Sequence, residues 1–163
     1  MENLLLDEML RRTATWCRIL GIDTEFFGGG GDDALLAQAK KEGRILITRD
    51  MALSKRCPKL GIKCILLSSE KAEEQIAQII SETGAQLFFP QEMRCPECNG
   101  ELGIAPADSV KEEVPPHIAS EHEEFWKCKK CGKIYWEGSH WKNIKEFYGR
   151  VLALLEKGKT EKT

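Results

Sequence analysis

The chain contains 163 residues, of which 42% are hydrophobic and 31% are charged, and its formal net charge is −2. This composition excludes a disordered chain, and the near-neutral charge does not by itself indicate a nucleic-acid binder. No apolar run approaches the roughly 20 residues that span a bilayer, so we expect no membrane association. The N-terminal residues lack the basic region and the long apolar stretch of a signal peptide, which favours a cytoplasmic location.

Residues 1–84 alternate between strand and helix patterns. Four short apolar runs predict strands, at residues 3–6, 24–27, 44–48 and 63–67. Amphipathic segments predict the helices that follow them, at residues 8–20, 32–42, 51–60 and 70–83. Because strands and helices alternate, we expect an α/β fold with a parallel sheet flanked by helices and right-handed crossovers.

From about residue 86 the chain becomes rich in glycine, proline and cysteine, and an acidic stretch covers residues 108–124. A last amphipathic helix is expected over residues 139–156. We therefore divide the chain into an α/β domain, a small second unit with the terminal helix, and a tail that is expected to fray, at residues 1–90, 91–157 and 158–163.

Four of the seven cysteines form two Cys-x-x-Cys pairs, at Cys95, Cys98, Cys128 and Cys131. In a chain without an export signal, such pairs indicate a metal site more than disulfides. Two residues between thiols allow both sulfurs to reach one ion, and a nearby glycine after each pair suits a tight turn. Four thiolates leave no open coordination position, so we predict a structural Zn²⁺ in a small ribbon. The alternatives are a redox dithiol or four unbound thiols.

Asp7 and Asp50 follow the first and third predicted strands, and Asp32 and Asp33 open the helix after the second strand. Because the carboxyl ends of parallel strands meet at one edge of a sheet, these side chains are expected to converge there. Converging carboxylates repel one another unless a cation joins them, and Mg²⁺ or Mn²⁺ prefers oxygen ligands. We predict a catalytic Mg²⁺ or Mn²⁺ site that activates water for attack on a phosphodiester. The alternative is that Asp32 and Asp7 only cap the helices that follow them, and that Asp33 in the first turn only favours the helix dipole.

Basic side chains accompany both candidate sites. Arg12 and Arg49 lie close in sequence to the acids, where a guanidinium can hold a substrate phosphate. Lys129 and Lys130 lie in the second cysteine pair, near tryptophans that can stack on bases, so they are candidates for binding single-stranded RNA. The alternative for the arginines is a solvated surface, and for Trp126, Tyr135 and Trp136 we favour packing inside the ribbon over base stacking.

Several motifs occur together along the chain: Leu5-Leu6-Asp7-Glu8-Met9-Leu10, Asp32-Asp33, Leu46-Ile47-Thr48-Arg49-Asp50, Cys95-x-x-Cys98-Asn99-Gly100, Phe125-Trp126-Lys127-Cys128 and Tyr135-Trp136-Glu137-Gly138-Ser139-His140-Trp141. On these motifs the chain resembles the PIN-like ribonucleases of the Mut-seven C-terminal RNase domain family. The resemblance implies a PIN-like α/β/α fold, a C-terminal zinc ribbon and metal-dependent cleavage of RNA. By position, Asp7, Asp50 and the Asp32-Asp33 pair match the family's acidic motifs, and we favour Asp33 of that pair as the metal ligand. The fourth acid of a typical PIN nuclease has no obvious match.

The leading hypothesis is a ribonuclease, a metal-dependent hydrolase in which Asp7, Asp33 and Asp50 act on RNA while the zinc ribbon helps to grip the substrate. The main alternative is a non-catalytic RNA- or ribosome-binding adaptor that keeps the fold and the structural zinc. A third hypothesis is a protein-interaction module that docks through the acidic segment at residues 108–124.

Overall fold

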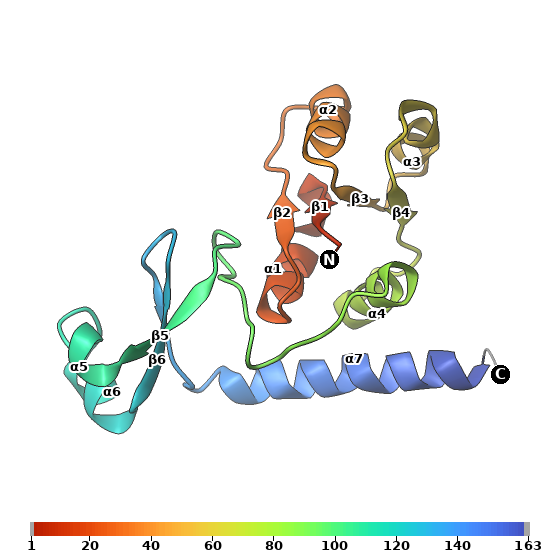
Figure 1. Cartoon of the computed structure of the whole chain (residues 1–163). Coiled ribbons are helices and arrows are strands. Elements are labelled where there is room, and N and C mark those ends of the chain that lie inside the picture. Colours follow the sequence, from red (N-terminus) through yellow and green to blue (C-terminus); the bar gives the residue numbers. More distant parts are fainter. Residues whose placement is uncertain (1, 162–163) are drawn as a thin grey trace.

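The structure is a computed structural model that describes residues 2–161. Its N-terminal part contains a four-stranded parallel sheet in the order β2-β1-β3-β4 (Figure 1). The strands are β1 Leu4–Leu6, β2 Thr24–Phe26, β3 Ile45–Thr48 and β4 Cys64–Leu66. The helices after them are the 3-10 helix η1 Glu8–Leu10 with α1 Arg11–Ile19, then α2 Asp32–Glu42, then α3 Met51–Arg56 with the 3-10 helix η2 Pro58–Leu60, and α4 Ala72–Thr83. The predicted α/β fold with a parallel sheet flanked by helices is confirmed.

Helices cover both faces of the sheet, because its strands are apolar on both sides. Leu4 and Leu6 of β1 belong to one buried cluster with residues of α1, α4 and the last helix, α7 Trp141–Glu161. Leu5 packs on the other face, in a second buried cluster with residues of α2 and α3. Successive side chains of a strand face opposite sides of the sheet, so a sheet that is buried on both faces requires uninterrupted apolar runs.

The terminal helix α7 packs under α4 and α1 and completes the core of the sheet domain (Figure 1). Phe147 and Val151 are buried, and Phe147 stacks on Trp16 with ring centroids 3.8 Å apart. The sequence pattern defines the apolar side of this helix but not its partner, which is why we grouped it with the ribbon instead. The tail that was expected to fray is helical as far as Glu161, and residues 162–163 lie outside the described part. No helix within residues 2–161 combines the length and the apolar character needed to cross a membrane.

The second unit is a three-stranded antiparallel ribbon in the order β5-β6-β7. Its strands are β5 Leu102–Pro106, β6 Glu124–Cys128 and β7 Ile134–Tyr135. Two short helices, α5 Ala107–Val110 and α6 Pro116–Glu121, are inserted between β5 and β6. Phe125, Val110 and Val114 form a small core under this insertion, which occupies the acidic segment.

The two ends of the parallel sheet have different neighbours. We call the end where β1 and β3 finish the carboxyl edge, and the end where the strands begin the amino edge. Asp7 and Arg49 directly follow β1 and β3 at the carboxyl edge, whereas Asp23 directly precedes β2 at the amino edge. The ribbon docks at the amino edge, where Asn99 contacts Asp23 and Thr24.

Candidate functional site

The four cysteines that we predicted as metal ligands lie together in the ribbon. Their sulfur atoms are all within 4.8 Å of one another, and residues 2–161 contain no second group of three or more His, Cys, Asp or Glu side chains that is gathered in this way. The Sγ atoms of Cys95 and Cys131 are 3.8 Å apart, and those of Cys98 and Cys128 are 3.4 Å apart. Tetrahedral coordination with Zn–S bonds of about 2.3 Å places sulfurs about 3.8 Å apart. The arrangement is therefore compatible with a zinc site.

The groups around Cys128 and Cys95 favour thiolates at these two sulfurs, whereas burial raises the pKa of Cys98 to about 12. Burial acts to raise the pKa of Cys128, but the backbone N–H groups of Cys131 and Lys130 donate to its sulfur and lower the pKa to about 6. The hydroxyl oxygen of Tyr135 lies 3.0 Å from the Cys95 sulfur. Burial raises the pKa of Tyr135, so this hydroxyl keeps its proton and can donate it to the sulfur. Such outer contacts orient metal ligands and stabilise their charge.

The first cysteine pair docks on β2, an outer strand of the parallel sheet. Asn99, with a φ of 67°, accepts a hydrogen bond at its Oδ1 from the backbone N–H of Thr24, at 3.0 Å. Arg18 donates from Nε to the carbonyl oxygen of Thr24, at 2.8 Å. Both backbone groups of Thr24 are therefore bonded by side chains on the open side of β2, where a neighbouring strand would otherwise be needed.

Charged groups at the amino edge reinforce this contact. The Nδ2 of Asn99 donates to Asp23 at 2.8 Å, and the guanidinium groups of Arg44 and Arg94 lie 2.9 Å and 3.8 Å from the same carboxylate. Burial opposes ionisation of Asp23, but the hydrogen bonds from Asn99 and Arg44 and the two positive charges outweigh it and lower its pKa from 3.8. Asp23 is thus a fixed anion that joins the sheet, the linker and the ribbon.

Asp7 and Asp50 lie at the carboxyl edge and are connected through Thr48. Asp7 is 4% exposed, its Oδ1 accepts from the N–H of Met9 at 3.0 Å, and its Oδ2 accepts a short hydrogen bond from the Thr48 hydroxyl. The oxygen of that hydroxyl accepts from the N–H of Asp50 at 3.0 Å. Asp50 also accepts from the N–H of Leu53, at 3.1 Å. Each aspartate therefore caps the helix that follows it, and the two belong to one hydrogen-bonded unit.

Asp32 and Asp33 begin α2 and are exposed. The N-cap position is Gly31, and no side chain caps this helix, so the capping role that we considered for Asp32 is wrong. Asp33 forms an ion pair with Arg56 of α3, and its side chain is 91% exposed. Within residues 2–161, the three aspartates that we predicted as metal ligands do not form a group of the kind found for the cysteines. Asp7 and Asp50 are therefore connected by hydrogen bonds through Thr48, whereas Asp33 is paired with Arg56.

Arg12 and Arg49 line one cavity of about 180 Å³ beside the carboxyl edge. Met9, two residues after the first candidate acid, also lines this cavity, and Arg49 immediately precedes Asp50. Arg49 lies 3.7 Å from Glu70, whose side chain is 84% exposed, so this ion pair is weak and open to exchange. The structure thus brings the two arginines that we predicted as phosphate ligands together, next to the acids.

Lys129 and Lys130 lie in the second cysteine pair, away from the carboxyl edge, because the ribbon docks at the opposite edge of the sheet (Figure 1). The Nζ of Lys129 is 3.4 Å from Glu101. Trp126 stacks on Trp141 with ring centroids 5.9 Å apart, and Trp141 is buried. These tryptophans therefore serve packing, the alternative that we considered for the ribbon aromatics, and the two lysines are not brought to the acids.

Three residues that we did not single out from the sequence hold these sites together: Thr48, Asn99 and Arg18. Thr48 carries a recognisable signal, because a hydroxyl two residues before an aspartate suits a local hydrogen bond to the backbone. Asn99 sits between Cys98 and Gly100 in a left-handed conformation that asparagine tolerates better than most residues. No sequence feature identifies Arg18 as a docking residue, because nothing in its helical position shows that it is buried.

Comparison with known proteins gives two matches. The family model described as the Mut7-C RNAse domain matches residues 2–148. A human protein named "Exonuclease mut-7 homolog" is 31% identical over 105 residues, which cover 60% of this chain and 12% of that protein. The match thus covers only a small part of that relative's length. No solved structure gives a significant match.

Proposed function

Because this chain belongs to the Mut7-C RNAse domain family, we propose that it is a divalent-metal-dependent ribonuclease that hydrolyses RNA phosphodiester bonds at the carboxyl edge of its sheet. The family and the name of the human relative suggest a nuclease. The observation that supports this place for the active site is the hydrogen-bonded unit of Asp7, Thr48 and Asp50. In a parallel sheet this edge is where active sites are built.

The chemistry of Asp7 and Asp50 suits Mg²⁺ or Mn²⁺. Asp7 is almost fully buried, yet only the N–H of Met9 and the hydroxyl of Thr48 bond to it, and no cationic side chain in the described residues pairs with it. A buried carboxylate is stabilised by a nearby cation, and carboxylate oxygens are preferred ligands of both ions. When bound, such an ion activates water and neutralises charge on the phosphate.

Asp33 enters this site only if its ion pair with Arg56 opens. The pair is exposed, so water screens it and its opening is inexpensive. Asp32, one residue earlier on the same helix turn, is the alternative ligand. Arg56 therefore competes with the metal for Asp33, and its removal tests whether Asp33 takes part.

Substrate binding is proposed for Arg12 and Arg49, whose shared cavity lies beside the acids and has a size suited to one phosphate group. Lys129 and Lys130 are proposed to contact RNA farther along the strand, since the ribbon lies at the other edge of the sheet. The Zn²⁺ that we propose for the four cysteines keeps the ribbon folded and takes no part in the chemistry.

Cleavage of a labelled single-stranded RNA, with Mg²⁺ or Mn²⁺ added, tests the proposal. Asp7→Asn and Asp50→Asn keep the helix caps but lose the charge, so each should reduce the rate about 100-fold or more. Asp108→Asn, an exposed substitution in α5, is the matched control and should leave the rate unchanged. Arg56→Ala should lower the metal concentration needed for half-maximal rate if Asp33 is a ligand.

The non-catalytic adaptor is the second candidate, because Asp7 and Asp50 already cap helices and Asp33 already has a partner. It predicts that the purified protein binds the RNA and cleaves none of it with either ion. Since the human relative is named an exonuclease, shortening of the RNA from one end is the pattern that we propose to look for first.

A further inference from the structure

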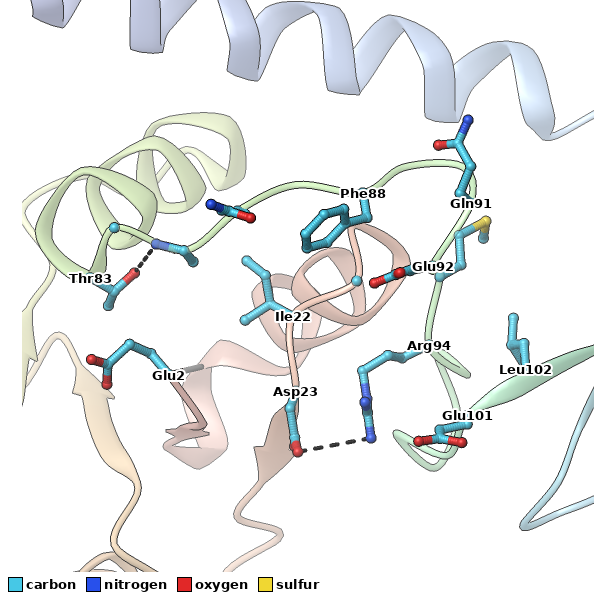
Figure 2. A pocket seen from close by; sticks show the side chains of 15 residues that line it. Glu2, Ile22, Asp23, Thr83, Phe88, Gln91, Glu92, Arg94, Glu101 and Leu102 are labelled. Carbon is cyan, nitrogen blue, oxygen red and sulfur yellow. Dashed lines mark hydrogen bonds and ion pairs between the residues drawn. The ribbon is translucent and has the colours of Figure 1, made fainter.

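A cavity of about 780 Å³ lies at the amino edge, on the opposite side of the sheet from the candidate acids. Its walls come from the start of the chain, the turn between α1 and β2, the linker between α4 and the ribbon, and the start of β5. Figure 2 shows Ile22 and Phe88 between the carboxylates of Glu2 and Glu92. None of the residues proposed for RNA cleavage lines this groove.

The groove is negatively charged. Four carboxylates line it, and Arg94 is the single basic side chain among its lining residues. Asp23 is already paired with Arg94, at 3.8 Å, and with Arg44, and Glu101 lies 3.4 Å from Lys129, so two of the four carboxylates are neutralised. Glu2 and Glu92 have no cationic partner among the described residues. This distribution repels the phosphates of a nucleic acid and attracts a cation.

An aromatic side chain lies among these charges. Phe88 is 37% exposed, although large aromatic side chains are mostly buried, and Figure 2 shows its ring directed into the groove. The face of such a ring attracts a guanidinium or ammonium group, and the aliphatic part of arginine or lysine packs against it. Phe88 beside Glu92 therefore fits one long cationic side chain.

The backbone of the linker is also available for binding. Gln86, which lines the groove, takes part in no backbone–backbone hydrogen bond within residues 2–161. An extended polypeptide can bond to such free N–H and C=O groups, as peptides do at an open strand. A free backbone group in the wall of the groove thus favours a polypeptide as the ligand.

The walls of the groove are held in place before anything binds. Gly21, with a φ of 91°, lets the linker approach so closely that a Cβ there would lie 2.7 Å from the carbonyl oxygen of Glu92. The N–H of Arg94 donates to the carbonyl oxygen of Arg18, at 2.8 Å. A preformed groove loses less entropy on binding than one that must be ordered.

We propose that this groove binds an extended, arginine-bearing polypeptide segment of a partner protein, with one guanidinium between Phe88 and the carboxylate of Glu92 and a second cationic side chain near Glu2. The site is independent of RNA cleavage, because its residues lie at the other edge of the sheet. Occupancy would leave the carboxyl edge free to act on RNA.

A fluorescein-labelled peptide of alternating arginine and serine, about eight residues and hence about 26 Å long, is a suitable probe for anisotropy titrations. Glu92→Gln and Glu2→Gln should each weaken binding about threefold. Phe88→Ala should weaken it about fivefold. The amide NMR signal of Gln86 should shift on addition of the peptide.

The matched control is Glu112→Gln, which removes an exposed carboxylate from the ribbon insertion and should not change the affinity. The same peptide with glutamate in place of arginine should not bind. If Glu112→Gln weakens binding as much as Glu92→Gln, or if the amide of Gln86 does not shift, the peptide binds by general charge attraction and the proposal is wrong. Displacement of the peptide by a single-stranded RNA would also overturn it, since that ligand should be repelled.

Discussion

Asn99→Ala tests how the ribbon is attached to the sheet domain. The side chain of Asn99 is buried, accepts from the fully buried N–H of Thr24 at 3.0 Å and donates to Asp23 at 2.8 Å. Alanine removes these two hydrogen bonds and the longer ones to Arg94 and Glu25, at 3.2 Å and 3.3 Å. It also keeps a Cβ at a φ of 67° without the polar side chain that makes this conformation tolerable.

The expected loss of stability follows from three contributions. An unpaired buried N–H at Thr24 costs about 1–3 kcal/mol. The lost donor to Asp23 costs about 1 kcal/mol, the low end for a charged acceptor, because two arginines remain beside it. The left-handed backbone adds about 1 kcal/mol for alanine. We therefore expect a decrease of about 3–5 kcal/mol in the free energy of unfolding, and about 1 kcal/mol less for Asn99→Gly.

Urea unfolding at a fixed zinc concentration measures this loss, and hydrogen exchange of the Thr24 amide reports the contact itself. Asn143→Ala, an exposed substitution in α7, is the control and should change stability by less than about 0.5 kcal/mol. A decrease below about 1 kcal/mol for Asn99→Ala, with an unchanged exchange rate at Thr24, would refute the proposed docking contact.

Two further predictions concern the same region. In Gly100→Ala the new Cβ would lie 2.8 Å from the Cys128 sulfur, so zinc affinity in a chelator competition should fall about tenfold or more, whereas Gly149→Ala, with nothing within 4 Å, should not change it. The pKa of Asp23 is lower in the folded protein than its ordinary 3.8, so its stabilising effect is complete above that value and is lost as the pH falls through the lower, folded pKa. The difference in unfolding free energy between the wild type and Asp23→Asn should therefore shrink below about pH 4, and a difference that is constant with pH would contradict the lowered pKa.

Much of the fold could be predicted because it depends on local patterns. Uninterrupted apolar runs mark strands that are buried on both faces, and β1, with three fully buried leucines, shows this most clearly. The spacing within each Cys-x-x-Cys pair limits which sulfurs can share one ion. The positions of Asp7 and Asp50 after parallel strands were sufficient to expect both at one edge of the sheet.

The rest depends on contacts between distant segments, which no local pattern encodes. The amphipathic pattern of α7 does not reveal that its apolar side faces α4 and Trp16 rather than the ribbon. The sequence likewise does not show that Arg56 forms an ion pair with Asp33, 23 residues away. The position of α7 and the Asp33–Arg56 ion pair both depend on how the helices pack around the sheet. The sequence contains many helix surfaces of similar polarity, so it does not show which of them will be in contact.

By itself, the sequence determined the parallel α/β sheet, the grouping of the four cysteines and the edge that carries Asp7 and Asp50. Only the tertiary structure decided that the ribbon docks at the opposite edge, through Asn99 and the backbone of Thr24, 75 residues away. The physical reason is that β2 is an outer strand whose free N–H and C=O groups must find partners. The sequence shows that such a strand exists, but which side chains satisfy it, and therefore where the lysines of the ribbon lie relative to the acids, is settled only when the chain is packed.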